Sequence, residues 1–234
     1  MTLKKWAIVL CSLSILFPYM TYGQESSGGF NRQGGPSSLT LDEVISKVEE
    51  RYKGADFSAR FYQVSTLKAV EITDTAKGRI FVKYPGMMRW EYETPEKQII
   101  LTDGKRLWIY RPGENQVMMG KAPSFFGDGK GAGFLSDIKR VRQYFDAANE
   151  KKDKNENYVI KLLPKKEMAG VSEIYLTVDR NRFEVVQIIT HNIYKDETRI
   201  ELSRLRFEQK LDSALFRFNI PDGVDVLQLE EPNR

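Results

Sequence analysis

Cysteine and histidine are almost absent from this sequence, with one of each in 234 residues. Cys11 lies in an apolar stretch near the N-terminus that is typical of an export signal, so we expect no disulfide and no cysteine metal site in the mature protein. Because His191 is the only histidine, a metal site built from several histidines is excluded. Stability outside the cytoplasm must then come from a packed core, which about 210 residues can form.

Catalytic motifs are also missing. A Ser-His-Asp triad would have to use His191, which falls late in a predicted strand, and the sequence has no nucleophile-elbow motif. The glycine-rich segment 127–133 lacks the Lys-Ser/Thr ending of a phosphate-binding loop and favours a flexible hinge. We therefore expect no catalytic residue, no metal and no cofactor, although a hydrolase with two carboxylates across a cleft stays open.

An excess of charge of one sign is absent too, since 36 lysines and arginines face 32 aspartates and glutamates. Removal of residues 1–23 takes away Lys4 and Lys5 and no acid, which leaves 34 basic and 32 acidic residues and a net charge of +2. Proteins that bind nucleic acid carry a concentrated basic surface. We therefore expect no nucleic-acid partner.

The N-terminal segment has the pattern of a secretory signal peptide. A short basic stretch precedes an apolar run of about 12 residues, which is too short to cross a bilayer because a spanning helix needs about 20. Small residues at Thr21 and Gly23 offer a cleavage site near Gly23. The predicted organisation is a signal peptide at 1–23, a disordered leader at 24–38, a structured domain at 39–227 and a C-terminal tail at 228–234.

Two other interpretations of this segment are weaker. It could remain as an uncleaved membrane anchor, or Cys11 could be the acylated N-terminus of a lipoprotein. The large Leu10 before Cys11 and the apolar residues that continue beyond it, up to Phe17, argue against acylation. A soluble exported protein is therefore expected.

One amphipathic helix should open the structured domain. Thr40 and Glu43 form a capping box, in which each side chain binds the backbone of the other. Apolar residues then recur at helical spacing until Gly54, so one face of the helix needs a surface to lie on. These residues are Leu41, Val44, Ile45, Val48 and Tyr52.

From Phe57 onward, the apolar residues alternate with polar ones, as on strands with one buried face. Turn signals such as Asp103-Gly104 and Pro112-Gly113 separate the strands at the short spacing that is typical of an antiparallel meander, sandwich or barrel. The predicted strands are 57–67, 78–84, 87–93, 97–102, 106–111, 115–119, 157–163, 172–179, 183–192, 197–208 and 215–220.

A second amphipathic helix is predicted in the break at 121–147, where apolar residues recur at helical spacing. These are Leu135, Ile138, Val141 and Phe145. The strand segment Leu107–Tyr110 is bulky on both faces, which requires cover on both. A curved sheet whose concave face is hidden by the two helices meets this need. We therefore expect a mainly β fold, an unclosed antiparallel β-barrel of about eleven strands with a lid of amphipathic helices.

Three segments resemble the outer-membrane lipoprotein carrier protein, LolA. Residues 78–117 contain its succession of a Pro turn, Arg-Trp, Asp-Gly and Leu-Trp, and residues 215–227 match its Phe-x-Phe-x-x-Pro-x-Gly ending. The segment 56–63 resembles its first strand, and the likeness runs from about residue 39 to 227. The resemblance implies a periplasmic carrier with an unclosed barrel and a helical lid. It would take acylated lipoproteins from an ATP-driven inner-membrane exporter to an outer-membrane receptor, without a cofactor and as a monomer.

The resemblance also implies where the acyl chains bind. Met88 and Trp90 match positions that the family keeps bulky and apolar. Tyr84 stands where the family often has an arginine that pins the lid, so Tyr84 and Arg89 are candidates for that contact. The expected cavity residues are Met88, Trp90, Tyr92, Trp108 and Tyr110, and the expected lid residues are Leu135, Ile138, Val141 and Phe145.

Other functions remain alternatives to the carrier. The same half-barrel occurs in the outer-membrane acceptor LolB, which is itself a lipoprotein, and the context of Cys11 argues against it. A periplasmic sensor module of similar fold would carry a second domain, for which residues 228–234 leave no room. An enzyme is the weakest alternative.

Overall fold

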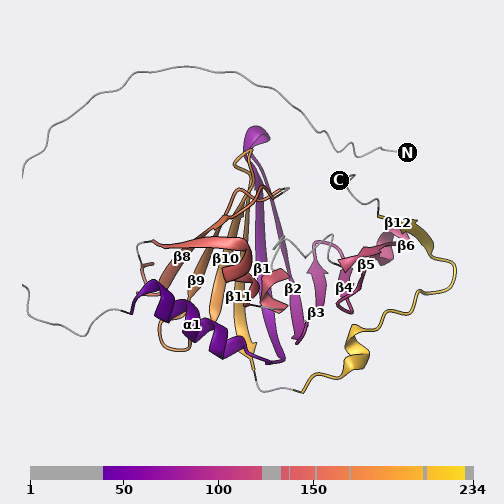
Figure 1. Ribbon diagram of the computed structural model, residues 1–234. Helices are drawn as coiled ribbons and strands as arrows, with labels where there is room; N and C mark the ends of the chain where they lie inside the picture. The colour runs from indigo at the N-terminus through magenta and orange to yellow at the C-terminus, as the bar shows by residue number, and fades with distance from the viewer. Residues whose placement is uncertain are drawn as a thin grey trace, which may run out of the picture. The chain divides into compact units, whose positions relative to one another are not determined.

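In the computed structural model, one continuous sheet organises the chain (Figure 1). The structure describes residues 39–122, 133–136, 138–150, 152–168, 170–207 and 210–229. The strands are β1 (Phe57–Leu67), β2 (Ile72–Lys83), β3 (Met87–Thr94), β4 (Gln98–Thr102), β5 (Arg106–Arg111), β6 (Gln116–Lys121), β7 (Phe145–Asn149), β8 (Tyr158–Pro164), β9 (Glu173–Val178), β10 (Val185–His191), β11 (Glu197–Arg206) and β12 (Asp225–Gln228). The helical elements are α1 (Leu41–Tyr52), α3 (Arg140–Tyr144) and the 3-10 turns η1 (Lys68–Val70), η2 (Pro112–Glu114), η3 (Gly133–Ser136) and η4 (Ser213–Phe216).

The sheet does not close on itself. Its twelve described strands follow the order β12-β6-β5-β4-β3-β2-β1-β11-β10-β9-β8-β7, so β12 and β7 are the two edges. Neighbouring strands are antiparallel except for β12, which pairs with β6 in parallel because the chain crosses over to reach it. The unclosed antiparallel β-barrel predicted from the sequence is therefore confirmed, with one strand more than expected.

Helix α1 forms as the sequence predicts. The Thr40 N–H donates to Glu43 Oε2 at 2.7 Å, and the Glu43 N–H donates to Thr40 Oγ1 at 3.3 Å. The hydrogen bonds that Thr40 donates to the Glu43 carboxylate lower the pKa of Glu43. The capping box defines the first turn of the helix. Val44, Val48 and Tyr52 bury the apolar stripe against the sheet. Figure 1 shows α1 on the half of the sheet formed by β8 to β11.

Alternating side chains give the sheet two different faces. We call the face that packs against α1, η3 and α3 the inner face, and its opposite the outer face. In the first half of β1, every second residue from Phe57 to Phe61 is buried on the inner face, and parts of β2, β3 and β8 continue this pattern. One large apolar core therefore runs beneath the helices, from β3 across the sheet to β8.

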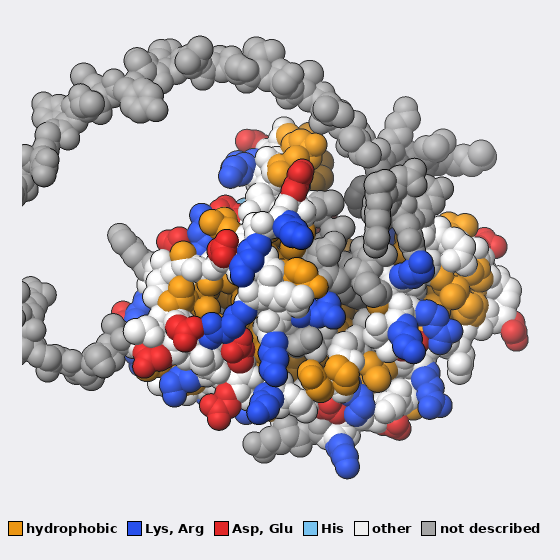
Figure 2. Space-filling model, in the orientation of Figure 1, with side chains coloured by type: hydrophobic (Ala, Val, Ile, Leu, Met, Phe, Trp, Pro, Cys, Tyr) orange, Lys and Arg blue, Asp and Glu red, His pale blue; other side chains and the backbone are white. Residues whose placement is uncertain are grey.

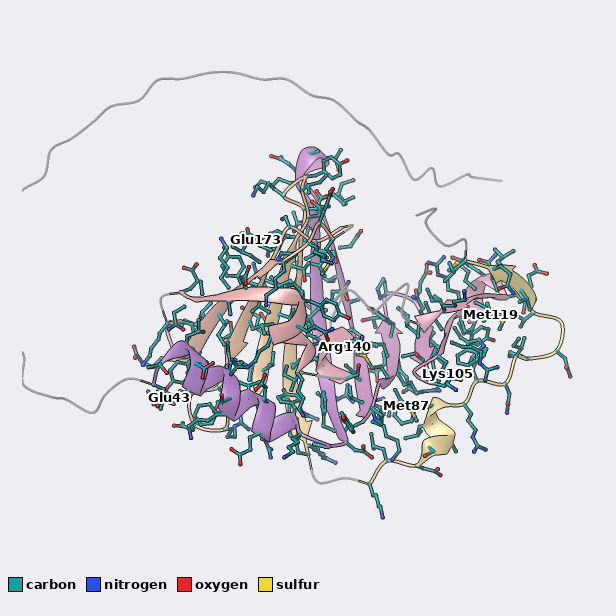
Figure 3. The ribbon with its side chains drawn as sticks, viewed as in Figure 1. Glu43, Met87, Lys105, Met119, Arg140 and Glu173 are labelled. Carbon is teal, nitrogen blue, oxygen red and sulfur yellow. The ribbon has the colours of Figure 1, made fainter. Side chains whose placement is uncertain are left out.

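Strand β5 is apolar on both faces because a second layer covers its outer face. Trp90 on the inner face pairs with Ile100, and Ile100 pairs with Ile109, so Ile109 faces inward and its neighbour Trp108 faces outward. The outward side chains are covered by the C-terminal segment, residues 210–229, which crosses the sheet at its β6 edge (Figure 1). This outer cluster contains Leu101, Trp108, Val117, Ile99, Tyr110, Met119, Phe218 and Val224, and Figure 3 labels Met119.

Phe218 should anchor the C-terminal segment. Its ring lies 5.5 Å from the ring of Tyr110 and 6.2 Å from that of Trp108. Replacing Phe218 by serine should lower the free energy of unfolding by about 2 kcal/mol, less than for a fully buried phenylalanine because Phe218 is half-buried. In thermal unfolding, the midpoint should fall by about 4–8 °C. Arg217→Ser, an exposed change at the neighbouring position, should have almost no effect; equal losses in both variants would contradict the anchor.

Three predictions about the elements are wrong. The strand predicted at 215–220 is instead η4 followed by an extended segment, and pairing with β6 begins only at Asp225. The helix predicted within 121–147 is broken, because η3 and α3 are separate and Phe145 already belongs to β7, a strand missing from the prediction. Residues 123–132 and 137, the signal peptide and the leader lie outside the described residues.

Candidate functional site

The inner face carries a continuous apolar surface at strands β1 to β3. The rings of Trp90 and Tyr92 each lie 4.9 Å from the ring of Phe61 in edge-to-face contact. The Tyr92 hydroxyl donates to Gln63 Oε1 at 3.1 Å, and burial raises the pKa of Tyr92 to about 12. The phenol is therefore neutral at physiological pH, and this part of the inner face carries no charge of its own.

An apolar pocket lies between the helical elements and the far half of the inner face. Its cavity volume is only about 10 Å³, about enough for one water molecule, so the lining side chains fill nearly all of the space. Side chains from α1, α3, the turn before α3, β8 and β9 line it without one polar group. The lining consists of Ile45, Val48, Ile138, Val141, Ile160, Leu162, Leu176 and Val178. Because every lining side chain is apolar, the pocket offers no group for acid–base or nucleophilic chemistry.

The C-terminal end of α1 is fastened to the sheet. Arg51 Nη2 donates to Glu184 Oε1 at 2.7 Å, and the Arg51 guanidinium lies 3.9 Å from the ring centre of Phe207. The Val185 N–H donates to the Tyr52 hydroxyl at 3.0 Å. Burial raises the pKa of Tyr52, which keeps this hydroxyl neutral. Separating α1 from the sheet would remove one of the two ion-pair partners of the buried Glu184; the other, Arg182 Nη1, lies 3.3 Å from its Oε2.

The other end of α1 is joined to α3 by one arginine. Arg142 Nε donates to Glu49 Oε1 at 2.8 Å, its Nη2 donates to Ser46 Oγ at 2.9 Å, and its Nη1 donates to Asp42 Oδ1. The hydrogen bond to Asp42 is the main reason that the pKa of Arg142 is raised. These partners occupy successive turns of α1, so Arg142 contacts one polar stripe of the helix. Sequence reasoning missed Arg142, although the stripe of Asp42, Ser46 and Glu49 was visible.

The structure divides the predicted cavity residues between the two faces. Met88 and Trp90 are buried on the inner face, with Trp90 only 4% exposed, and Tyr92 shares their side of β3. Trp108 and Tyr110 lie on the outer face beneath the C-terminal segment. Placing all five in one cavity was wrong, because β5 is apolar on both faces and its register decides which side chains face inward.

All four predicted lid residues are buried in the inner core, but they do not share one helix. Leu135 belongs to η3, Ile138 lies in the turn before α3, and Val141 belongs to α3. Phe145 belongs to strand β7 and is therefore part of the sheet rather than of a lid. Ile138 and Val141 line the apolar pocket directly.

In the described contacts, neither candidate for the lid contact touches α1, η3 or α3 through its side chain. The Tyr84 side chain is 44% exposed. Arg89 Nη1 donates to the backbone oxygen of Leu215 at 3.2 Å, so it holds the C-terminal segment instead. The contact to η3 comes from the turn between β2 and β3, where the Gly86 N–H donates to the Ser136 carbonyl at 3.4 Å. The turn that contains Tyr84 does contact η3, but through the backbone of Gly86 rather than through a side chain.

His191 lies between two carboxylates, with Nδ1 at 3.1 Å from Glu173 and Nε2 at 3.3 Å from Glu197. Within the described part of the chain, no group of three or more histidine, cysteine or acidic side chains is placed to hold a metal ion. In that same part, no helix is long and apolar enough to cross a membrane.

Comparisons with known proteins point to one family. A family profile described as "Outer membrane lipoprotein carrier protein LolA" matches residues 53–219. An outer-membrane lipoprotein carrier protein of Chromobacterium violaceum is 32% identical over 213 residues, which cover 91% of this chain and 97% of the relative. One of Neisseria meningitidis serogroup C is 28% identical over 162 residues, covering 69% of this chain and 76% of the relative.

The fold has a counterpart among solved structures. An uncharacterized conserved protein of Thermus thermophilus superposes with a TM-score of 0.53 at 12% identity, covering 80% of this chain and 98% of that protein. At this identity the likeness concerns the fold alone. The match of the family profile over most of the described domain decides the classification. This chain belongs to the outer-membrane lipoprotein carrier protein family, LolA.

Proposed function

We propose that this protein is a periplasmic carrier that binds the acyl chains of lipoproteins on the inner face of its sheet. One observation carries the proposal: an unclosed sheet presents a continuous apolar face, and in the described part of the chain short helical elements cover it. In a domain without a ligand site, the elements that cover the hydrophobic core would stay in place permanently. The relatives named as lipoprotein carriers supply the cargo class.

The cover must move before cargo can enter, because the cavity of about 10 Å³ has no room for even one acyl chain. Helix α1 is fastened to the sheet by Arg51 and Tyr52. The segment from η3 to α3 is held by apolar contacts, by Arg142, by the weak backbone hydrogen bond of Gly86, and by Lys165, whose N–H and Nζ donate to the carbonyls of Tyr144 and Arg142. We therefore assign the lid to residues 133–144, of which the structure describes all but one.

The energies of the closed and loaded states are comparable. Lid closure buries Leu135, Ile138 and Val141, at about 1.5–3 kcal/mol each, or about 5–9 kcal/mol together. A buried methylene contributes about 0.8 kcal/mol, so roughly 6–11 methylenes replace these contacts. One long acyl chain is enough to displace the lid, which suits a carrier that must both load and unload.

The transport route is part of the same proposal. The signal-like segment 1–23 would export the protein, with cleavage near Gly23. The carrier would then receive lipoproteins from an ATP-driven inner-membrane exporter and deliver them to an outer-membrane receptor, as a monomer and without a cofactor. The family and the absence of polar groups in the pocket support a binding protein rather than an enzyme.

Tryptophan emission can test where the acyl chains bind. In a Trp6→Phe, Trp108→Phe variant, Trp90 on the inner face is the only tryptophan. Adding a synthetic diacylated lipopeptide should shift and brighten its emission, since the chains displace the lid and pack against the ring. The same peptide without its lipid should change nothing.

The matched control places the reporter on the other face. A Trp6→Phe, Trp90→Phe variant keeps only Trp108, which lies beneath the C-terminal segment. Its emission should not respond to the lipopeptide. A response of Trp108 without a response of Trp90 would place the lipid on the outer face and refute the proposed site.

A further inference from the structure

Exposed apolar side chains gather at one end of the sheet, away from α1. Eleven large hydrophobic residues are exposed in the described part of the chain, and five of them lie on two neighbouring hairpin tips. Val70 is 60% exposed and Ile193 is 70% exposed, which is unusual for such residues unless they contact a partner. We call this set the apolar tip: Leu67, Val70, Ile72, Ile193 and Tyr194.

The two hairpins form one surface. The backbone N–H of Lys68, at the turn between β1 and β2, donates to Asp196 Oδ1 at 2.8 Å. Asp196 belongs to the turn between β10 and β11, and Thr66 pairs with Glu197 just below it. Figure 1 shows the β1–β2 hairpin projecting beyond the other strands, and Figure 2 shows orange side chains at its end. The sheet therefore carries its apolar tip on a fixed protrusion.

The charges around the tip suit a lipid surface. Asp196 is occupied within the turns, since its Oδ2 accepts a hydrogen bond from Asn192 Nδ2 at 2.9 Å. Among the described residues, the ammonium groups of Lys68 and Lys195 form no ion pair. Glu71 is the one acid between Leu67 and Ile72. The apex thus combines aliphatic side chains with two free ammonium groups, which can reach lipid phosphates while the aliphatic groups enter the interface.

We propose that the apolar tip docks on the surface of a phospholipid bilayer. A projecting surface needs no matching cleft in its partner, and a bilayer interface receives such a shape, whereas a folded protein would need a complementary groove. Tyr194 adds an amphipathic ring of the kind that favours the membrane interface. The contact is expected to be weak and reversible because only five apolar side chains take part. The tip is separate from the acyl-chain site, so this inference does not depend on the proposed cargo.

Vesicle flotation can test the docking. The full chain, as purified from cells that export it, is mixed with vesicles of phosphatidylethanolamine and phosphatidylglycerol in a ratio of roughly 3:1, which gives an anionic bilayer. A Val70→Ser, Ile193→Ser variant should lower the partition coefficient about tenfold, because two exposed apolar groups are lost. The matched control, Ile220→Ser, Val226→Ser, removes two exposed aliphatic side chains from the C-terminal segment at the β6 edge and should bind like the parent.

A local probe distinguishes contact at the tip from binding elsewhere. In a Cys11→Ser background, a polarity-sensitive dye on Val70→Cys should shift to the blue with vesicles, whereas a dye on Val226→Cys, at the β12 edge, should not. Equal binding of the two double variants, or equal shifts at both labels, would overturn the proposal. Unchanged vesicle binding combined with a loss of lipoprotein transfer by the tip variant would indicate a protein partner and would overturn it as well.

Discussion

Replacing Gly78 by alanine should destabilise the protein by about 3 kcal/mol or more, a large share of the roughly 5–15 kcal/mol that holds a typical domain folded. Gly78 lies in β2 at a register shift opposite β3. A methyl group at this position would overlap the Glu91 carbonyl oxygen and would lie 2.9 Å from Phe61 Cε1. Because a carbonyl in a paired strand cannot turn aside cheaply, the two strands must separate beside the inner core.

Thermal unfolding measures this effect. The midpoint should fall by about 6–12 °C for a loss of about 3 kcal/mol in a domain of this size. Gly113→Ala is the matched control, because a methyl group there meets no atom within 4 Å. Its midpoint should stay within about 2 °C of the parent. Similar midpoints for both variants would show that the register shift relaxes without cost.

The Ile138→Asp variant should lose lipoprotein transfer while its sheet stays folded, because a lid that no longer closes cannot displace bound acyl chains for delivery. Ile138 is buried against the apolar pocket, where an aspartate carboxylate would find no hydrogen-bond donor. The lid can avoid this cost by leaving the sheet. Because α3 has only five residues, its departure disturbs little of the remaining structure. The closed state should weaken by about 3 kcal/mol or more, which corresponds to an open population raised about 100-fold.

Hydrogen exchange and transfer assays together test this expectation. Amides of α3 should exchange about 100-fold faster, whereas amides of β1, β2 and β11 should keep their protection. Gln143→Asp adds the same charge at an exposed position of α3 and should change neither exchange nor transfer. Normal transfer by Ile138→Asp would show that the proposed lid has no part in loading. Lost protection throughout the sheet would show instead that Ile138 belongs to the structural core.

The sequence predicted those parts of the fold whose signals are local. The capping box of Thr40 and Glu43 defined α1, and the alternation of apolar residues defined most strands. Strand β7 was missed because its sequence, FDAAN, has small residues and no clear alternation. The segment after Leu215 has a strand-like pattern but packs through Phe218 on another sheet face instead of pairing.

The site was predictable only where one face of a strand is polar. On β3, the alternation of Met88 and Trp90 with charged residues decides which side faces inward. On β5, both faces are apolar, so the sequence could not place Trp108 relative to Trp90; that depends on the register across β4. Arg142 could not be chosen from the several arginines nearby, because its partners lie about 100 residues earlier in the chain.

The connection made by Arg142 also limits how tightly a carrier of this design can bind. The contacts of Arg142 to Asp42, Ser46 and Glu49 stabilise the closed form. In the proposed carrier only the open form binds cargo, so this stabilisation makes the free energy of cargo binding less favourable by the same amount. Each increment of about 1.4 kcal/mol in these contacts lowers the apparent affinity about tenfold. Because exposed ion pairs are screened by salt, the ionic strength around the protein sets this limit, and cargo is held more loosely in dilute surroundings than in saline ones.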